Sequence, residues 1–304
     1  MATTIGIIGM GWVGASTAIS ILHSGAAQTL LLNDIRTEVA EGEAMDLAHG
    51  ASFYPAATVR TADVEAMRDA DVVVVAAGRG GTPGETRLDL LKGNAAIIRD
   101  IGARLAGSRG IIIVISNPVD VLTHVMVEAT GLPPERVIGT GTMLETARLR
   151  KLLGHELGLD PRSIHAQVLG EHGDSSVVIW SEARIGGVRL RDWSGWDRAN
   201  EARLSEAVRT AAYEIIRRKG ATNHAIGLVT AALIRWMLRG GQRVLTVSRV
   251  QSGALGLSDV ALSLPTVVGR EGATTVLEPA MDEAERAALL HSAEVLRTAA
   301  ASVR

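Results

Sequence analysis

The sequence contains no cysteine, and only 3% of its 304 residues are aromatic. The absence of cysteine excludes disulfides, thiolate metal sites and thiol nucleophiles, and we expect no bound metal ion. With so few aromatic residues the core must be aliphatic, and stacking platforms for single-stranded nucleic acid are not expected. The sequence also has no large excess of positive or negative charge, because it contains 31 basic and 33 acidic residues. This balance predicts no general attraction to nucleic acid or to anionic membranes.

Residues 1–33 carry no Asp, Glu, Lys or Arg, a pattern that could indicate a signal peptide or a membrane helix. Two features argue against that interpretation. No basic segment precedes the apolar run, and Gly6, Gly9, Gly11 and Gly14 interrupt it. We therefore expect no membrane association and a cytoplasmic location.

Short apolar runs alternate with helical patterns along the first half of the chain. Runs rich in Val, Ile and Leu predict buried strands, and apolar residues at helical spacing predict the helices between them. This alternation favours an α/β fold with a doubly wound parallel sheet. The strands are expected at 4–8, 29–33, 71–76 and 111–115, and the helices at 13–23, 37–49 and 87–105.

The pattern changes near residue 140, without a linker rich in proline or serine. Helices are expected at 143–157, 200–219, 224–238 and 283–301, and strands at 164–169, 177–185, 244–250 and 260–268. The sequence thus predicts one domain over residues 1–140 and an α+β domain over residues 141–304, with a broad shared interface.

A glycine-rich motif, GMGWVG, lies between the first predicted strand and the first predicted helix. Its glycines allow a tight turn, the approach of a pyrophosphate and close packing of helix on strand. Asp34 follows the second strand, 20 residues after Gly14, where a carboxylate binds ribose hydroxyls. These features predict a Rossmann domain that binds NAD, while Arg36 leaves NADP open. The loop residues expected to contact the cofactor are Gly9, Met10, Gly11, Trp12, Val13 and Gly14.

Two further segments follow predicted strands and so lie at the carboxyl edge of the sheet, where doubly wound folds bind ligands. Residues 77–87 hold four glycines and a proline and end in Arg87. A cation at a helix start opposes the helix dipole, so Arg87 indicates an anionic partner; a solvated side chain is the alternative. Asn117, in SNPVD, can donate and accept hydrogen bonds, but an ordinary turn residue before proline is the alternative.

Three residues of the second half are candidates for chemistry. Glu145 and Arg148 lie three apart on one predicted helix, which alone indicates no more than a surface ion pair. His172 lies in the segment GEHGD, where flanking glycines predict a turn that exposes the imidazole to a cavity. Histidine is the side chain whose ordinary pKa suits proton exchange near neutral pH.

Together these motifs resemble the lactate/malate dehydrogenase family in order and spacing. The motifs GMGWVG with Asp34, AGRGGTPGETRLDLLKGN, SNPVD, GTGTMLETARLR and GEHGD carry the resemblance, and KGAT and VLTVS extend it over essentially the whole chain. The bacterial L-lactate dehydrogenase branch is most similar. The resemblance implies an NAD-dependent L-2-hydroxy-acid dehydrogenase, with pyruvate and L-lactate as the first expected pair. Malate dehydrogenase and a broad-specificity 2-hydroxy-acid dehydrogenase are the alternatives.

The resemblance also implies roles for these residues. His172 matches the acid/base histidine, and Glu145 falls where the family has the aspartate that orients it. Arg148 matches the arginine that binds the substrate carboxylate, and Arg87 the one that polarises the reacting carbonyl. Asn117 matches an asparagine beside the nicotinamide.

The substrate pocket is implied less completely. Thr222 matches a threonine of the pocket wall, and Gly81 aligns with the position where lactate enzymes have glutamine and malate enzymes arginine. Glycine matches neither, so the sequence leaves the identity of the 2-hydroxy acid open. Arg79, two residues earlier, could bind a substrate carboxylate or a cofactor phosphate. Glu145 is one methylene longer than the expected aspartate.

Two rival classes are disfavoured. NAD-dependent glycosidases resemble this framework, but their pattern includes a metal-ligating cysteine, which this chain lacks. An NAD-binding redox sensor without catalytic activity is disfavoured because Arg87, Arg148 and His172 are all retained.

Arg150 and His165 suggest an allosteric phosphate site. They fall where lactate dehydrogenases activated by fructose 1,6-bisphosphate have an arginine and a histidine between subunits of a tetramer. The resemblance therefore implies a homotetramer and this effector, whereas ordinary interface or surface residues are the alternative.

Overall fold

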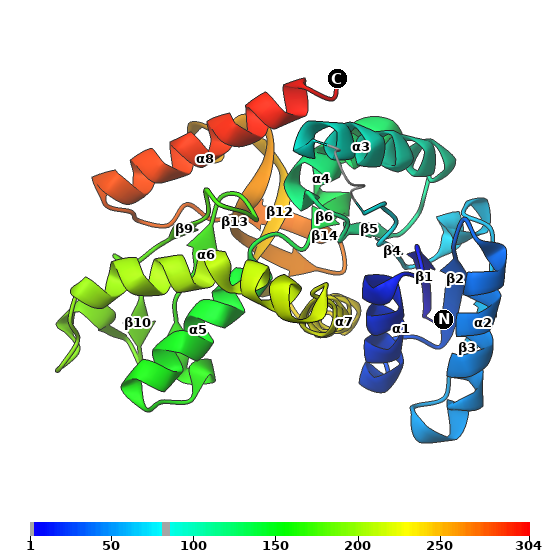
Figure 1. The fold of residues 1–304 in the computed structure, drawn as a ribbon, viewed down its shortest axis with the longest axis horizontal. Coiled ribbons are helices and arrows are strands. Elements are labelled where there is room, and N and C mark those ends of the chain that lie inside the picture. Colours follow the sequence, from blue (N-terminus) through cyan, green and yellow to red (C-terminus); the bar gives the residue numbers. More distant parts are fainter. Residues whose placement is uncertain (1–2, 81–85) are drawn as a thin grey trace.

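The computed structural model describes residues 3–80 and 86–304. Six strands of the first half pair in parallel in the order β3-β2-β1-β4-β5-β6, the order of a Rossmann fold (Figure 1). The predicted α/β fold class is confirmed. These strands are β1 (Thr4–Ile8), β2 (Thr29–Asn33), β3 (Thr58–Thr61), β4 (Val72–Val75), β5 (Ile111–Val114) and β6 (Val137–Gly139).

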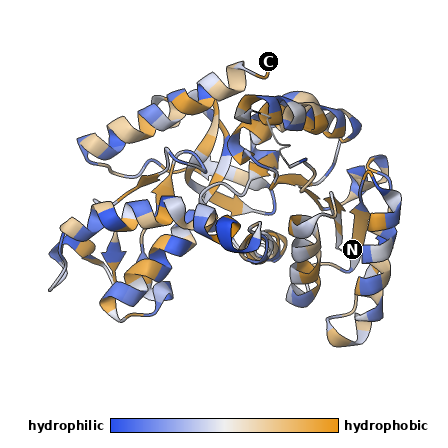
Figure 2. Cartoon of the chain, viewed as in Figure 1, coloured by the Kyte–Doolittle hydropathy of each residue, from blue (hydrophilic) through white to orange (hydrophobic). Residues whose placement is uncertain are grey.

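Helices cover both faces of this sheet because its strands are apolar on both sides (Figure 2). Alternate residues of one strand enter opposite cores: Val72 and Val74 pack with α1 and α2, whereas Val73 and Val75 pack with α3 and α4. The helices of this half are α1 (Trp12–Ser24), α2 (Thr37–His49), α3 (Arg87–Arg104) and α4 (Val119–Thr130).

The second half extends the same sheet. Strands β12 (Arg243–Ser252), β13 (Ser258–Gly269) and β14 (Gly272–Val276) are antiparallel, and β12 joins β6 where Ser248 lies opposite Gly139. Two small sheets lie outside it, one formed by β7 (Ile164–His165), β10 (Arg184–Ile185) and β11 (Val188–Arg189), the other by β8 (Val168–Leu169) and β9 (Val177–Val178).

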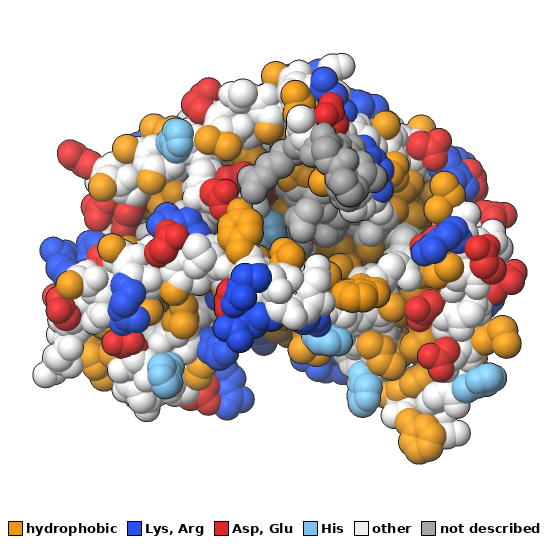
Figure 3. All heavy atoms as spheres, in the orientation of Figure 1, with side chains coloured by type: hydrophobic (Ala, Val, Ile, Leu, Met, Phe, Trp, Pro, Cys, Tyr) orange, Lys and Arg blue, Asp and Glu red, His pale blue; other side chains and the backbone are white. Residues whose placement is uncertain are grey.

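Four helices complete this half: α5 (Met143–Leu157), α6 (Ala199–Lys219), α7 (His224–Leu238) and α8 (Glu283–Ala301). Helix α7 packs against α1, and α8 packs against α4 and β13, so elements of the second half lie against both faces of the first (Figure 1). Within the described ranges, no helix is both long and apolar enough to cross a membrane. Acidic and basic side chains are interspersed on the face seen in Figure 3.

Several elements differ from the sequence prediction. The expected strands at 164–169 and 177–185 are each divided between two sheets, because β7 pairs with β10 and β8 pairs with β9. The strands β3, β6 and β14 and the helix α4 were not predicted. Strand β3 is polar and only partly buried, and β6 has three residues, so neither carries a strong apolar signal.

Candidate active site

The glycine motif forms the turn from β1 into α1, and the backbone shows why two of its glycines are needed. Gly9 has φ of 95°, and a Cβ atom there would lie 2.6 Å from the backbone nitrogen of Ala77. A Cβ on Gly14 would lie 1.9 Å from the carbonyl oxygen of Gly9. Both glycines therefore allow close packing of the turn on helix and neighbouring strand.

Gly11 is different, because among the described residues no atom outside its chain neighbours would lie within 4 Å of a Cβ at this position. Its φ of −70° is open to any residue, so neither packing nor conformation explains the glycine. Gly11 is the N-cap of α1, and the free N–H groups and positive dipole end of a helix suit an anion. The space and the helix end together fit the pyrophosphate of a dinucleotide.

Asp34 lies at the carboxyl end of β2, next to this turn. Its Oδ2 accepts a hydrogen bond of 2.7 Å from the backbone N–H of Met10, and its Oδ1 accepts one of 3.0 Å from the backbone N–H of Arg36. The Arg36 guanidinium lies 3.9 Å from Oδ1 on a side chain that is 66% exposed. A fixed carboxylate at the ribose position disfavours a 2′-phosphate and so fits NAD. Nearby, Trp12 is exposed and Val13 is half-buried at the start of α1.

The segments after β4 and β5 lie together at the same sheet edge. Ser116 Oγ donates to the carbonyl oxygen of Ala77, and Asn94 Nδ2 donates to the carbonyl oxygen of Asn117 at 3.2 Å. Asn94 Oδ1 also accepts the backbone N–H of Arg79 at 2.9 Å. Asn94 therefore joins the two segments, as Ser116 does, and the sequence did not single it out. Arg87 begins α3, while its side chain and Gly81 lie outside the described part of the chain.

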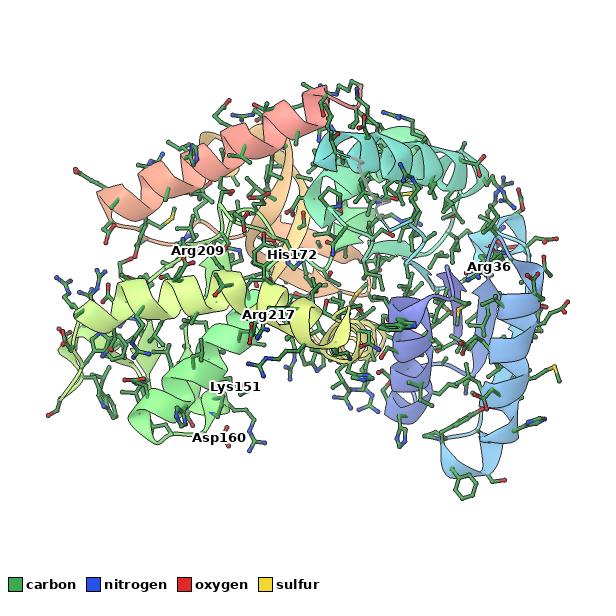
Figure 4. All side chains as sticks on the ribbon, in the orientation of Figure 1. Arg36, Lys151, Asp160, His172, Arg209 and Arg217 are labelled. Atoms are coloured by element: carbon green, nitrogen blue, oxygen red, sulfur yellow. The ribbon has the colours of Figure 1, made fainter. Side chains whose placement is uncertain are left out.

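A cavity of about 370 Å³ lies beside this edge and brings residues of both halves together. Figure 4 shows His172 near the centre of the molecule, with Arg209 of α6 in the same region. The lining includes Leu90, Leu91, Asn117, Glu145, Arg148, His172, Arg209 and Tyr213. Thr222, in the connection between α6 and α7, is not among the lining residues, so its assignment stays a prediction.

Glu145, Arg148 and His172 form one hydrogen-bonded group in this cavity. Glu145 Oε2 lies 3.0 Å from His172 Nδ1, and its Oε1 accepts a 2.9 Å bond from Arg148 Nη1. The Glu145 side chain is 6% exposed, against 15% for Arg148 and 25% for His172. Glu145 and Arg148 are thus not a surface ion pair, and the longer glutamate reaches both partners at hydrogen-bonding distance.

The charges of this group shift the pKa values of its members. Burial lowers the pKa of His172, but the adjacent Glu145 carboxylate outweighs this and leaves the pKa above its ordinary value. Burial raises the pKa of Glu145, but the charges of His172 and Arg148 outweigh that and leave it below its ordinary value. At neutral pH Glu145 is therefore a carboxylate that stabilises protonated His172 and holds its Nδ1 side.

Two contacts around His172 were not expected from the sequence. Asp120 Oδ2 accepts the backbone N–H of His172 at 2.7 Å, and the Asp174 carboxylate accepts the Tyr213 hydroxyl at 2.8 Å. Asp120 belongs to the SNPVD motif, but the sequence predicted no role for this residue. No local pattern pairs residues 52 or 39 positions apart, so only the tertiary fold reveals these contacts.

Arg150 and His165 lie away from this cavity. They line a second one, of about 280 Å³, together with Glu182 and Arg184. Burial lowers the pKa of Arg150, whose Nε donates to the carbonyl oxygen of Ala166 at 3.0 Å. The structure therefore brings the two residues together, in a cavity that is also lined by a second arginine, Arg184, and by the carboxylate of Glu182.

The chain belongs to the lactate/malate dehydrogenase family. The model of the family's NAD-binding domain matches residues 3–139, and the model of its alpha/beta C-terminal domain matches residues 142–303. The protein is accordingly an NAD-dependent oxidoreductase with a Rossmann domain.

Particular relatives are similar over nearly the whole chain. The L-lactate dehydrogenase of Salinibacter ruber is 45% identical, over 99% of this chain and 97% of its own. That of Thermus aquaticus is 42% identical, over 98% of this chain and 99% of its own. The crystal structure of the minor L-lactate dehydrogenase of Enterococcus mundtii in its ligands-bound form superposes with a TM-score of 0.97 at 38% identity. That superposition covers 100% of this chain and 99% of the other.

Proposed function

We propose that the protein is an NAD-dependent L-lactate dehydrogenase, which reduces pyruvate to L-lactate and oxidises NADH to NAD. The observation that carries this proposal is the group of Glu145, Arg148 and His172 in a cavity beside the dinucleotide edge. Relatives of 45% and 42% identity that are L-lactate dehydrogenases support the choice of substrate.

Each of these side chains has a task that follows from its contacts. NADH, when bound, supplies the hydride. Protonated His172 donates a proton from Nε2 to the substrate oxygen, while Glu145 holds Nδ1 and stabilises the imidazolium. Arg148 keeps further N–H groups beyond the one that Glu145 accepts, and these bind the substrate carboxylate. Asn117 lines the same cavity, where its amide orients the nicotinamide side of the reaction.

Three assignments rest on the resemblance alone. Arg87 polarises the reacting carbonyl, Thr222 forms part of the pocket wall, and Gly81 occupies the position that discriminates between substrates. We further propose domains at residues 1–140 and 141–304, a cytoplasmic location and a homotetramer. The limits of the two family models, 3–139 and 142–303, support the domain division.

The test of the reaction is a panel assay that follows NADH oxidation with pyruvate, oxaloacetate, 2-oxoisocaproate and phenylpyruvate. The proposal predicts the highest kcat/KM for pyruvate. A preference for oxaloacetate would instead assign a malate dehydrogenase, and similar values across the panel a broad-specificity enzyme. Binding of NADH with no turnover of any compound would instead favour an NAD-binding redox sensor without catalytic activity.

The residue at position 81 is expected to set substrate preference. Gly81→Gln restores a neutral wall beside a methyl group and should raise the preference for pyruvate over oxaloacetate. Gly81→Arg offers a cation to the second carboxylate and should lower it, since a well-formed charge pair shifts such ratios by several kcal/mol. The measurement is the ratio of kcat/KM for the two acids. A change of less than about twofold in both variants would show that position 81 does not discriminate.

We also propose that Arg150 and His165 bind fructose 1,6-bisphosphate. Their shared cavity, with Arg184 also in its lining, supports an anion site. Arg150 and Arg148 lie on α5, so neutralising a cation there can shift the helix that carries the substrate-binding arginine.

Fructose 1,6-bisphosphate at millimolar concentration should lower KM for pyruvate near pH 7, and Arg150→Gln should abolish this effect. Saturation curves of the unmodified enzyme, with and without the effector, provide the measurement. Arg162→Gln is the matched control, because Arg162 is 91% exposed and pairs with Asp160. Curves that superimpose for the unmodified enzyme would leave Arg150 and His165 with structural roles only.

A further inference from the structure

The turn that carries His172 is fixed by hydrogen bonds to three different elements. Gly170 exchanges two backbone hydrogen bonds of 2.9 Å with Ser263 of β13, and the Glu171 N–H donates to Ser292 Oγ of α8 at 2.8 Å. The contact with the third element, from the His172 N–H to Asp120 of α4, is the shortest at 2.7 Å. Among these three, only the bond to Asp120 holds the amide of His172 itself, and only it ends on an ionisable group.

Asp120 is an unusual partner for an amide because its carboxyl group is deeply buried. The residue is 2% exposed, and its second oxygen, Oδ1, has no well-formed hydrogen bond among the described residues, although the Ser248 hydroxyl lies near the carboxyl group. A buried carboxylate with only one well-formed hydrogen bond is costly for the fold, so packing alone gives no reason to keep a carboxylate rather than an amide here. A negative charge beside His172 does give such a reason.

We propose that Asp120 is a positioning residue for the reaction. It fixes the turn that presents the His172 imidazole to the cavity, and it adds a second buried negative charge that stabilises the imidazolium. Asp120 also lies three residues after Asn117, at the start of α4. Residues 117–120 therefore connect Asn117, on the nicotinamide side of the site, to His172, the acid/base residue, and fix their relative position. The inference rests on the proposed role of His172.

The direction of the charge effects agrees with this role. Burial raises the pKa of Asp120 to about 6, against the opposing effects of the nearby Ser248 hydroxyl and the His172 N–H. Asp120 is thus mostly ionised at neutral pH, and its charge acts with that of Glu145 to raise the pKa of His172. The other charged side chains of the described residues around His172 are Arg148 on α5, Glu171 and Asp174 on its own turn, and Arg209 on α6.

The decisive variant is Asp120→Asn, which retains an oxygen to accept the His172 N–H but removes the charge. Loss of a neighbouring negative charge destabilises the imidazolium, so the pKa of His172 should fall by about one unit. NMR titration of the His172 ring measures this directly, with the signal assigned by its loss in His172→Gln. Glu128→Gln is the control, because Glu128 lies on the same helix with its side chain 43% exposed and pairs with Arg304. It should leave the titration unchanged.

Activity supplies a second measurement. The fall in kcat/KM for pyruvate with rising pH should move to lower pH in Asp120→Asn, by the same interval as the NMR titration. Asp120→Ala also removes the acceptor. Its kcat should be at least about tenfold below that of Asp120→Asn, with the Kd for NADH unchanged. If Asp120→Ala does not fold, Asp120→Asn alone decides.

The outcomes separate this inference from the proposed function. A titration of His172 in Asp120→Asn that superimposes on that of the unmodified protein overturns the positioning role, whatever the activity. If the pKa falls but the unmodified protein reduces no 2-oxo acid, the electrostatic coupling stands and the dehydrogenase proposal fails.

Discussion

Replacing His172 with alanine is expected to lower kcat for pyruvate reduction by at least about a hundredfold, while the Kd for NADH stays within about twofold. A positioned acid or base contributes about 10²–10⁴-fold to a proton transfer, and alanine removes the donor altogether. The dinucleotide contacts are expected instead at the glycine turn, at Asp34 and at the segments joined by Asn94. Steady-state assays and a fluorescence titration of NADH measure the two quantities.

A matched control for this variant is His155→Ala. His155 is exposed near the end of α5, the helix that also carries Glu145, and it lies outside the lining of the cavity. Its loss should leave kcat and the Kd for NADH unchanged. Turnover near the native level in His172→Ala would remove His172 from the mechanism.

Glu145→Gln is expected to lower kcat by about 10²–10³-fold and to move the pH profile. Glutamine can still accept the Nδ1–H of His172, but it carries no charge to stabilise the imidazolium or to pair with Arg148. The Glu145 carboxylate raises the pKa of His172, so loss of the carboxylate should lower this pKa. The decline of pyruvate reduction with rising pH should then move to lower pH. Profiles of kcat/KM between pH 5 and pH 9 measure the shift.

Glu145→Asp separates charge from reach. Aspartate keeps the negative charge but is one methylene shorter, so it cannot hold both contacts of about 3 Å without movement of α5. We expect kcat within about tenfold of the native value and a pH profile close to the native one. A loss as large as that of Glu145→Gln would mean that the length of the side chain, and not its charge, governs the site.

The sequence predicted several elements of both halves well because their signals are local. Strand β2 and helices α2, α5, α7 and α8 have the predicted bounds, since continuous apolar runs and helical spacing are visible without knowledge of the fold. The motifs also indicated that Glu145, Arg148 and His172 would form a site. What the sequence left open was that one glutamate would reach both partners and be nearly excluded from water.

The parts that could not be predicted depend on distant contacts. Asp120 is polar, lies one residue after the start of a helix and has no local feature that separates it from an ordinary first-turn acid. The role that we propose for it rests on burial and on a partner in the other half of the chain. Tyr213 is similar, because a half-exposed tyrosine on an amphipathic helix gives no sign that Asp174 accepts its hydroxyl.

The pairing of β12 with β6 makes the nine strands one continuous sheet, so the chain has two sequence domains but a single structural frame. Moving the two halves apart as rigid bodies would require breaking main-chain hydrogen bonds and uncovering the packed faces of α1 and α7. The relative position of Asn117 and His172 is therefore fixed by the continuous sheet and the helices packed on it. We therefore expect substitutions such as those at Gly81 to change which acid is accepted while leaving Asn117 and His172 in the same relative position.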